Sequence, residues 1–318
     1  MVDAVRNDRS VSGQPVAKQS PARLAQTLRA ISRARMAYLF MAPAYLLMLL
    51  FIAYPLVRSL WLSLFEWNGI TPAKYIGLAN FNALLHDDTL PKVIYNTMAF
   101  AVVTAAGTVL LGFVLAVVIE RRVKGWAIFK VTYFLPVMMS MTVVGLLWGQ
   151  LYDPTFGPIN VLLKAMGVAK PPVWMGDPKV ALYAIIAVAI WQYAGFPMIV
   201  LLAAMEGIPG DTHDAATIDG VNVMQRVMHI IFPMIKQVFA VIVMLQLIFG
   251  LKVFDVIWVM TQGGPGESTT VLGVYLYRNA FVYTHFGYGS AVAVFMTVII
   301  FTLSMLYQRY IRPEAVEY

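Results

Sequence analysis

The sequence contains no cysteine and carries little charge. Of its 318 residues only 12% are charged, while 60% are hydrophobic. Because soluble domains carry about twice this share of charged residues, the composition excludes an ordinary soluble domain and indicates an integral membrane protein. Without cysteine, neither a disulfide framework nor a thiolate metal site can form.

The sequence also lacks the motifs of the common catalytic sites. It has no GxxxxGK[ST] phosphate-binding loop, so we do not expect this chain to bind and hydrolyse ATP in the usual way. No GxSxG motif occurs, and the four histidines show no HExxH spacing: His86, His213, His229 and His285. We therefore expect isolated surface histidines, no metal site and no catalytic residues, so the chain is not predicted to be an enzyme.

Six apolar windows run along the chain, each long enough for a helix of about 20 residues that crosses a bilayer. They predict an all-α integral membrane protein with six transmembrane helices at 37–57, 94–119, 128–150, 181–204, 237–260 and 287–307. Residues 1–36 are rich in Ser, Gln, Ala and Arg without an apolar period, which predicts a disordered basic tail. The transmembrane domain would then cover 37–310, with a short tail at 311–318. The first window is as long as a full span, so we interpret it as a retained helix rather than a cleaved signal peptide.

Lysine and arginine are distributed unevenly over the predicted connections. With the N-terminus inside, fifteen of the 23 lie in the tail, in the turn at 120–130, in the 205–236 loop and at the C-terminus. Positive residues favour the cytoplasmic side of a membrane protein. We therefore expect both termini and the 205–236 loop in the cytoplasm, and segments 66–92, 152–179 and 261–286 outside. Orientation in a membrane also accounts for the net charge of +7 without nucleic acid as a partner.

The 205–236 loop contains the charged stretch DTHDAATIDGVNVMQRVMHIIFP, at 211–233. Asp211 is suited to cap a short helix, and Gly220 to take the left-handed position after its end. Pro233 is expected to stop the next helix near Phe232. At about 100° per residue, the polar residues of 221–231 fall within one arc of about 100°, and apolar residues fill the rest. These polar residues are Asn222, Gln225, Arg226 and His229. The pattern predicts helix, hinge and amphipathic helix.

Two interpretations of this amphipathic helix stay open. It can lie along the membrane surface, or it can seat in a groove on a soluble partner and pass its motion to the spans. Lipid binding is expected to use a basic polar face, whereas the loop has more acidic than basic residues. The acidic residues are Glu206, Asp211, Asp214 and Asp219, and the basic ones Arg226 and Lys236. The negative charge therefore disfavours anionic lipid.

The stretch DAATIDG, followed by Ile230 and then IFP, resembles the EAA loop of inner-membrane permeases of binding-protein-dependent ABC importers. In that loop an acidic residue, two alanines, a glycine, an isoleucine and a proline recur at this spacing. YIGLANF, YNTMAF and WQYAGFPMIVLLAAMEGIP are similar to the carbohydrate branch, the maltose-type and glycerol-phosphate-type permeases. The resemblance covers about residues 37–310. The sequence departs from the family at the usual glutamate, which is Asp214 here, at two frequent aromatics and at the common leucine before the proline. The last three are Met224, Val227 and Phe232.

The resemblance implies a permease of the bacterial inner membrane that imports a sugar or sugar derivative. Its expected partners are a second, similar permease, a pair of cytoplasmic ATP-binding subunits and an extracytoplasmic solute-binding protein. This chain would bind no cofactor, since ATP and Mg would belong to the ATPase. The 205–236 segment, which we call the coupling loop, would contact the ATPase through Asp214, Ala215, Ala216, Asp219, Gly220, Ile230 and Pro233. The 261–270 loop would face the binding protein.

Aromatic and amide side chains within two predicted spans are candidates for the sugar path, because aromatic faces and hydrogen-bonding groups bind sugars. In the fourth span, the resemblance puts one face toward the pore: Trp191, Gly195 and Met198. In the fifth span the corresponding residues are Gln246, Phe249, Gly250 and Val253. Helix packing is an equal alternative for each residue, with Gly195 and Gly250 allowing close contact and Gln246 bonded to another helix.

Lys252 and Asp255 are charged residues that fall inside the fifth predicted span. A charge within a span costs about 2.5 to 3.5 kcal/mol, so each needs a partner or water. They can pair with each other, snorkel to the interface or line the sugar path. We leave these alternatives open.

Two other classes of membrane protein were weighed against the permease. A membrane enzyme acting on lipids usually has clustered carboxylates or histidines, and the nearest approach is the isolated run His86, Asp87 and Asp88. A channel or secondary transporter working alone is expected to show internal repeats, which are not visible.

Overall fold

The computed structural model describes residues 35–122 and 124–310. The predicted tail at 1–36 falls outside the described residues apart from its last two positions, and the tail at 311–318 falls outside them entirely. The chain divides into two units, Met1–Arg58 and Ser59–Tyr318. Each unit is described by itself.

The first unit contains most of the first apolar helix, whose last residues, from Ser59 on, are counted with the second unit. α2 (Arg35–Met48) continues through a π-turn, η1 (Leu49–Ala53), into α3 (Tyr54–Leu62). Together they form an apolar helix, Met36–Leu62, that is long enough to cross a membrane. Its apolar side chains are exposed all round, with Phe40 as an example. A helix that is apolar on every face suits surroundings of lipid or protein rather than water.

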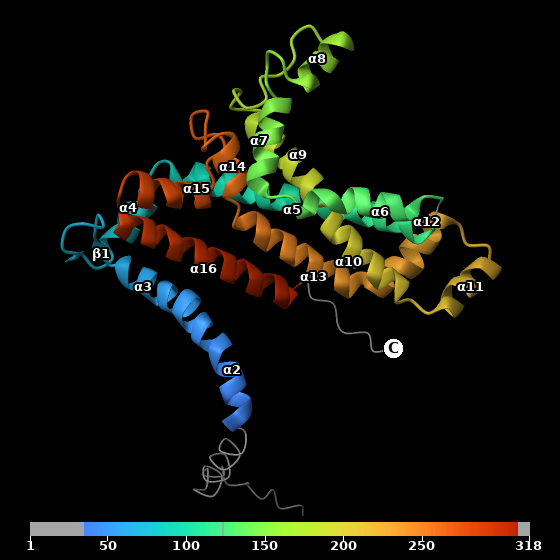
Figure 1. Ribbon diagram of the computed structural model, residues 1–318, viewed down its shortest axis with the longest axis horizontal. Coiled ribbons are helices and arrows are strands. Elements are labelled where there is room, and N and C mark those ends of the chain that lie inside the picture. Colours follow the sequence, from blue (N-terminus) through green and yellow to red (C-terminus); the bar gives the residue numbers. More distant parts are fainter. Residues whose placement is uncertain (1–34, 123, 311–318) are drawn as a thin grey trace, which may run out of the picture. The chain divides into compact units, whose positions relative to one another are not determined.

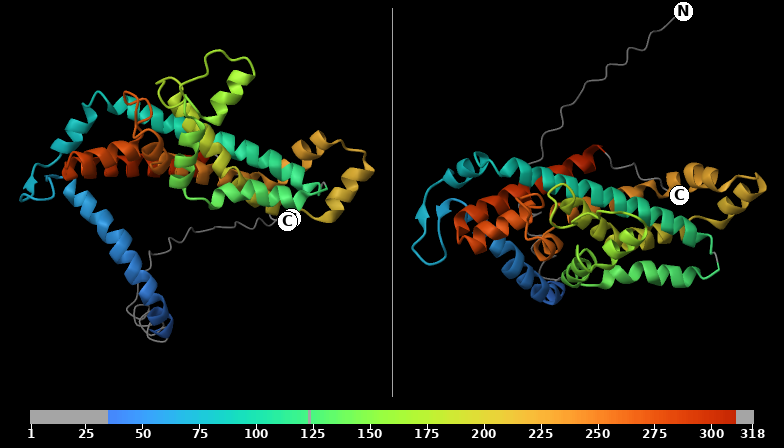
Figure 2. Two further views of the ribbon diagram at one scale, coloured as in Figure 1. Left: turned by 45° about the horizontal axis from the view of Figure 1, so that its top comes forward. Right: turned by 90° about the horizontal axis from the view of Figure 1, so that it is seen from above.

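The second unit contains four more helices of membrane-spanning length and composition. They are α5 (Leu90–Glu120), α9 with α10 (Ala181–Tyr193 and Gly195–Glu206), α12 to α13 (Val223–Leu251), and α16 (Phe286–Tyr310). These helices and α2–α3 confirm five of the six predicted membrane helices by length and composition. Figure 1 labels them, and Figure 2 shows them from two further sides.

The third apolar window, 128–150, is not one straight helix. α6 (Trp126–Phe134) ends in a short 3-10 turn, η2 (Leu135–Met138), and α7 (Met141–Leu151) follows at 101° to it. The reason is local: Met139 and Ser140 both take extended backbone angles, which interrupt the helical hydrogen bonding. If this bent pair counts as one broken span, the described residues hold six candidate spans.

The fifth window, 237–260, had both of its boundaries wrong. The helix begins at Val223, runs as α12 (Val223–Arg226), a π-turn η3 (Val227–Ile231) and α13 (Phe232–Leu251), and ends before Lys252. A separate helix, α14 (Asp255–Met260), follows. Pro233 therefore does not stop the amphipathic helix. It lies at the start of α13, directly after η3, where the N–H of Phe232 already bonds five residues back to Val227. The π-turn changes the backbone hydrogen-bond spacing to five residues just before Pro233, which has no N–H to donate.

The connections contain short elements rather than plain turns. β1 (Phe65–Glu66) and β2 (Lys74–Tyr75) form a small antiparallel hairpin, a minor exception to the all-α prediction. Short helices lie in all three connections predicted to be outside: α4 (Ala79–Leu85), α8 (Pro158–Ala165), α15 (Leu272–Tyr277) and the π-turn η4 (Arg278–Val282).

Helix α5 lies at the centre of the second unit, where it packs most extensively against α10 and α13. Two glycines permit this close approach. A Cβ added at Gly112 would lie 2.8 Å from the carbonyl oxygen of Ala194, and one at Gly250 would lie 2.6 Å from the Cα of Ala101. Neighbouring helix backbones can approach this closely because small residues occupy the interface.

Candidate functional site

A cavity of about 250 Å³ lies between α5, α7, α9 and α13. We call it the central cavity. It includes six of the nine residues predicted for the sugar path: Gln246, Phe249, Gly250, Lys252, Val253 and Asp255. Its remaining lining comes from Phe100, Thr104, Met141, Ala189, Tyr193, Phe254 and Val256. The fold thus gathers most of the predicted set into one concave site.

Two polar side chains of the central cavity are buried. Gln246 is 5% exposed, and its Nε2 donates to Thr108 Oγ1 on α5 at 2.8 Å. This is the bond across helices that was kept as an alternative for Gln246, although the side chain also borders the cavity. Thr104 is 6% exposed, and its Oγ1 has no hydrogen-bond partner among the described residues. Buried hydroxyls are nearly always bonded, so this covered and unpaired hydroxyl is an exception beside the cavity.

Lys252 and Asp255 do not lie inside a span. Lys252 follows the last residue of α13, and Asp255 is the first residue of α14, so the prediction that both lie inside the fifth membrane helix was wrong. Both side chains are exposed, and no ion pair joins them in the part of the chain that the structure describes. Each charge is favourably placed by itself, because a cation suits a helix C-terminus and an anion a helix N-terminus.

The three candidates from the fourth predicted span lie outside the central cavity. Trp191 is exposed and makes an edge-to-face contact with Trp148, with ring centroids 5.4 Å apart. Gly195 lies against α6, where an added Cβ would be 2.3 Å from the carbonyl oxygen of Tyr133. Met198 is fully buried. Gly195 and Met198 pack within the chain, whereas Trp191 is exposed. Ala189 and Tyr193 are the residues of this segment that line the cavity.

The coupling loop begins with α11 (Gly210–Ile218). This helix starts one residue before Asp211, so Asp211 is not its cap but lies in its first turn. Gly220 takes the predicted left-handed conformation, with φ of +67°. The N–H of Val221 donates to the carbonyl of Ala216 at 3.1 Å, which is the bonding pattern of a glycine-terminated helix. The predicted order of helix, hinge and helix is therefore present.

The predicted ATPase contacts in the coupling loop differ in exposure. Asp214, Ala215 and Asp219 on and after α11 are exposed, whereas Ala216 is buried against the chain. Gly220 and Pro233 are exposed and Ile230 is half-buried. The same surface also exposes large apolar side chains, with Ile218 85% and Met224 69% exposed. The helix pair therefore exposes both acidic and apolar side chains.

The amphipathic helix is fastened to α5 by a contact that the sequence pattern did not reveal. Arg226 belongs to the predicted polar face, and its Nη2 lies 2.6 Å from Oε1 of Glu120, the last residue of α5. The side chains are 28% and 12% exposed respectively. At its start the helix has a capping box, in which Asn222 and Gln225 exchange side-chain and backbone hydrogen bonds. The Asn-x-x-Gln spacing signals this box, whereas nothing local signals the ion pair.

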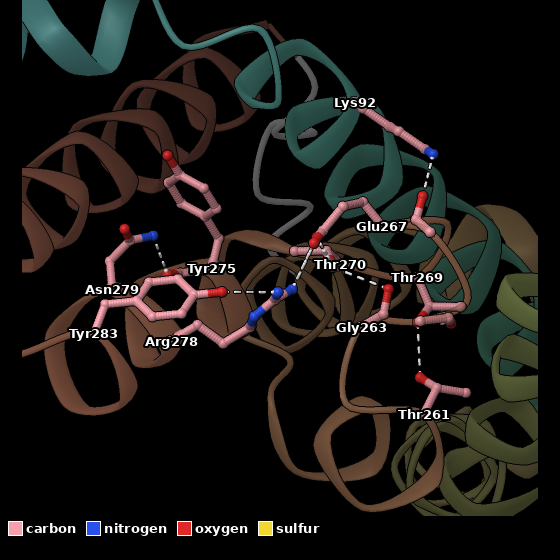
Figure 3. Close-up of polar contacts among 12 residues, drawn as sticks. Lys92, Thr261, Gly263, Glu267, Thr269, Thr270, Tyr275, Arg278, Asn279 and Tyr283 are labelled. Atoms are coloured by element: carbon pink, nitrogen blue, oxygen red, sulfur yellow. Dashed lines mark hydrogen bonds and ion pairs between the residues drawn. The ribbon is translucent and has the colours of Figure 1, made fainter.

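The 261–270 loop is tightly bonded (Figure 3). Thr270 Oγ1 donates to the carbonyl of Gly263 at 3.0 Å, and Arg278 makes two hydrogen bonds to the carboxylate of Glu267 at 2.7 and 3.0 Å. Burial alone would lower the pKa of Arg278, but the bonds to Glu267 outweigh it and raise the pKa above its usual value. Lys92 Nζ, from α5, donates to the carbonyl of Gly266 at 2.8 Å. The loop has a defined shape held from α5 and from η4.

The run at 86–88 is part of the scaffold. Asp87 accepts hydrogen bonds from Tyr275, Tyr288 and the N–H of Thr89. Burial would raise the pKa of Asp87, but these hydrogen bonds outweigh burial and hold the pKa below its usual 3.8. His86, the residue that follows α4, bonds the carbonyl of Asn82 in that helix. Among the described residues, no group of three or more His, Asp or Glu side chains is arranged to hold a metal ion.

Comparison with known proteins identifies the family. Residues 108–316 match the family model of the binding-protein-dependent transport system inner membrane component. A probable ABC transporter permease of Pyrococcus horikoshii is 34% identical over 86% of this chain and 94% of its own length. A trehalose/maltose transport system permease of Thermococcus litoralis is 30% identical over 86% of this chain and 92% of its own length.

A solved structure has the same fold. It is a chain of a bacterial alginate ABC transporter in complex with an alginate pentasaccharide-bound periplasmic protein, with a TM-score of 0.80 and 23% identity. The similarity covers 91% of this chain and 99% of that one. The helical arrangement and the sequence matches agree, and the chain belongs to the family of binding-protein-dependent transport system inner membrane components.

Proposed function

We propose that this chain is a permease subunit of an ATP-driven importer for a sugar or sugar derivative. It forms half of a translocation path and receives conformational energy from a separate ATPase through the coupling loop. The observation that carries the proposal is the central cavity, a concave site between membrane-spanning helices that is lined by aromatic, amide and charged side chains. Small-molecule sites are usually concave, mostly apolar and supplied with a few polar groups that fix the ligand.

A sugar is the substrate class that this cavity suits. Phe249 and Tyr193 offer aromatic surface, and Gln246, Thr104, Lys252 and Asp255 offer hydrogen bonds to hydroxyl groups. The names of two related proteins, a trehalose/maltose permease and an alginate transporter, support a carbohydrate substrate. The three candidates outside the cavity, Trp191, Gly195 and Met198, take packing roles in this proposal.

The coupling loop is the proposed contact with the ATPase. α11 presents Asp214, Ala215 and Asp219 to the surroundings, and apolar Ile218 and Met224 are exposed beside them. An ATPase groove with a basic residue and an apolar floor would complement this surface. Asp214 keeps the charge of the family's usual glutamate on a shorter side chain. The permease then alternates between two arrangements, and the ATPase shifts that equilibrium only through its different affinity for the two.

The remaining partners and the orientation follow from the same proposal. A second, similar permease completes the path, and a solute-binding protein delivers the sugar to the side of the 261–270 loop. The chain is a multi-pass protein of the bacterial inner membrane with both termini in the cytoplasm. ATP and Mg bind to the ATPase subunits, and this chain holds no cofactor.

Substitution of Gly220 tests the coupling role. A Cβ at this position would meet nothing within 4 Å, so Gly220→Val causes no collision, but φ of +67° is unfavourable for a branched residue. We expect G220V to re-aim α11 and abolish sugar uptake in liposomes that contain the co-expressed ATPase, sister permease and binding protein. Membrane insertion and yield stay unchanged.

Gly210→Ala is the matched control. Gly210 is the first residue of α11, has no atom within 4 Å of an added Cβ and does not have a positive φ. G210A is expected to transport like the parent protein. Normal uptake by G220V would contradict the coupling role of the hinge. A parent protein that purifies and transports without any ATPase would contradict the importer itself.

A further inference from the structure

Helix α5 reaches from the 261–270 loop to the coupling loop without a break. It has 31 residues, Leu90–Glu120, and its one proline lies in the first turn. At 1.5 Å per residue its length is about 46 Å, roughly that of a bilayer including its headgroup regions. In Figures 1 and 2 its first turns lie near α4 and α15 and its last turns near α12. One stiff element therefore passes all three regions described above.

The first turns of α5 are bonded to the 261–270 loop and the start of α15. Asn96, which is buried, donates to the carbonyls of Glu267 and Thr270, each at 3.0 Å. Lys92 donates to Gly266, as Figure 3 shows, and Thr97 Oγ1 accepts from the N–H of Leu272 at 2.9 Å. These are directional bonds to backbone groups, so the loop is expected to move with this end of the helix.

The middle of α5 borders the central cavity, and its last residue is fastened to the coupling loop. Phe100 and Thr104 line the cavity, and Thr108 bonds Gln246 of α13. At the far end the Glu120–Arg226 pair, made through Nη2 of Arg226, is largely shielded from water, and Arg226 Nε has no hydrogen-bond partner among the described residues. Removal of one partner of a shielded ion pair is costly, because it leaves the other charge without compensation.

We propose that α5 transmits the state of the coupling loop to the central cavity and to the 261–270 loop, and that Glu120 and Arg226 are positioning residues that join it to the coupling loop. This inference rests on the proposed function. Coupling between distant sites is carried by rigid elements and bonded networks that have two arrangements. Here the coupling loop moves, the ion pair moves α5, and Asn96 and Lys92 carry the displacement to the other end.

The test uses the complete importer in liposomes and four changes at the pair. Glu120→Gln and Arg226→Met each remove one charge. The double variant E120Q/R226M removes both and leaves no buried charge unpaired, and E120R/R226E exchanges the charges. Arg121→Gln is the control, because it removes an adjacent, exposed charge that forms no ion pair among the described residues. The readout is the ratio of ATP hydrolysis with and without sugar-loaded binding protein.

We expect each single variant to keep basal hydrolysis and to lose about tenfold in the stimulation ratio, a typical size for coupling between distant sites. The exchange variant should recover most of the ratio, and R121Q should leave it unchanged. The double neutral variant separates coupling from folding. It should assemble even where a single variant does not, and it should stay uncoupled.

A second measurement follows the far end of α5. Because the chain has no cysteine, Gln262→Cys places one thiol of this chain on the exposed part of the 261–270 loop, with partner subunits made free of cysteine. A fluorophore there should report an ATP-dependent change in the parent protein and little change in E120Q/R226M.

Two results would overturn the inference: normal stimulation in E120Q/R226M, or an unaltered ATP-dependent signal at position 262 in that variant. Either would reduce the pair to a structural contact while leaving the proposed function intact. An absence of stimulation in the parent complex would instead contradict the proposed function.

Discussion

The hydrogen bond between Gln246 and Thr108 allows packing and transport to be separated, because only one of its partners borders the central cavity. Gln246→Leu removes the donor and keeps a side chain of similar size. Thr108 still donates to the backbone of its own helix, at 2.8 Å to the carbonyl of Thr104, so the change leaves little unsatisfied. Hydrogen bonds between membrane helices contribute about 0.6 kcal/mol on average and up to about 1.7 kcal/mol. We expect Q246L to lower the free energy of unfolding by that amount.

Thr108→Val removes the same bond from the other side without changing the lining of the cavity. We expect a similar loss of stability, slightly larger because the amide of Gln246 loses its acceptor while 5% exposed. The two variants should differ in transport. If Gln246 bonds a sugar hydroxyl, its loss weakens that contact by about 0.5 to 1.5 kcal/mol, which corresponds to a two- to twelvefold slower uptake.

The assay compares both variants in the reconstituted importer at limiting sugar-loaded binding protein, with thermal unfolding in detergent measured in parallel. Uptake by Q246L should be slow and uptake by T108V close to that of the parent protein, although T108V loses at least as much stability. Equal uptake defects in the two variants would show that Gln246 acts through packing alone. Normal uptake by Q246L would remove it from the proposed path.

Two further predictions concern the scaffold. Gly250→Ala should lower the unfolding free energy by about 1 to 3 kcal/mol, because the new Cβ would lie 2.6 Å from the Cα of Ala101. Gly149→Ala, whose Cβ would meet nothing within 4 Å, should be neutral or stabilising, and equal effects of the two changes in thermal unfolding would refute the close contact. The second concerns Asp87, whose lowered pKa means that its contribution to stability is present above its unfolded pKa and lost as the pH falls through the lower folded value. Tyr275→Phe should therefore cost more stability at pH 7 than below pH 3.8, as followed by unfolding at both pH values, and a pH-independent loss would exclude ionised Asp87 as the relevant partner.

Features of the coupling loop differ in how far the sequence could predict them. The hinge at Gly220 was predictable, because a left-handed residue after a helix is a local requirement that glycine meets. The capping box of Asn222 and Gln225 also had a local signal, the Asn-x-x-Gln spacing, but it was not predicted. The ion pair of Arg226 was not predictable. A helical wheel shows which face of the helix carries a residue, but it does not show which other element packs against that face.

The lining of the central cavity was likewise only partly predictable from the sequence. Gln246, Phe249, Gly250 and Val253 were predicted as one face of a helix, and the fold places all four at the cavity. Thr104 and Tyr193 were missed as lining residues because their roles depend on how α5 and α9 approach α13. Trp191, Gly195 and Met198 share a helical face by spacing, but Gly195 and Met198 meet neighbouring parts of the chain rather than open space.

The sequence by itself determined the membrane class, the positions of most apolar helices and the hinge of the coupling loop, because each depends on residues close together in the chain. The length of an apolar run sets whether a helix can span a bilayer, and local backbone angles set where a helix ends at a hinge. Only the tertiary structure decided the bend at Met139 and Ser140, the continuous helix through Pro233, and the contacts of Glu120 with Arg226 and of Asn96 with the 261–270 loop. Those contacts join residues more than a hundred positions apart, and no local pattern specifies which distant side chain completes a pair.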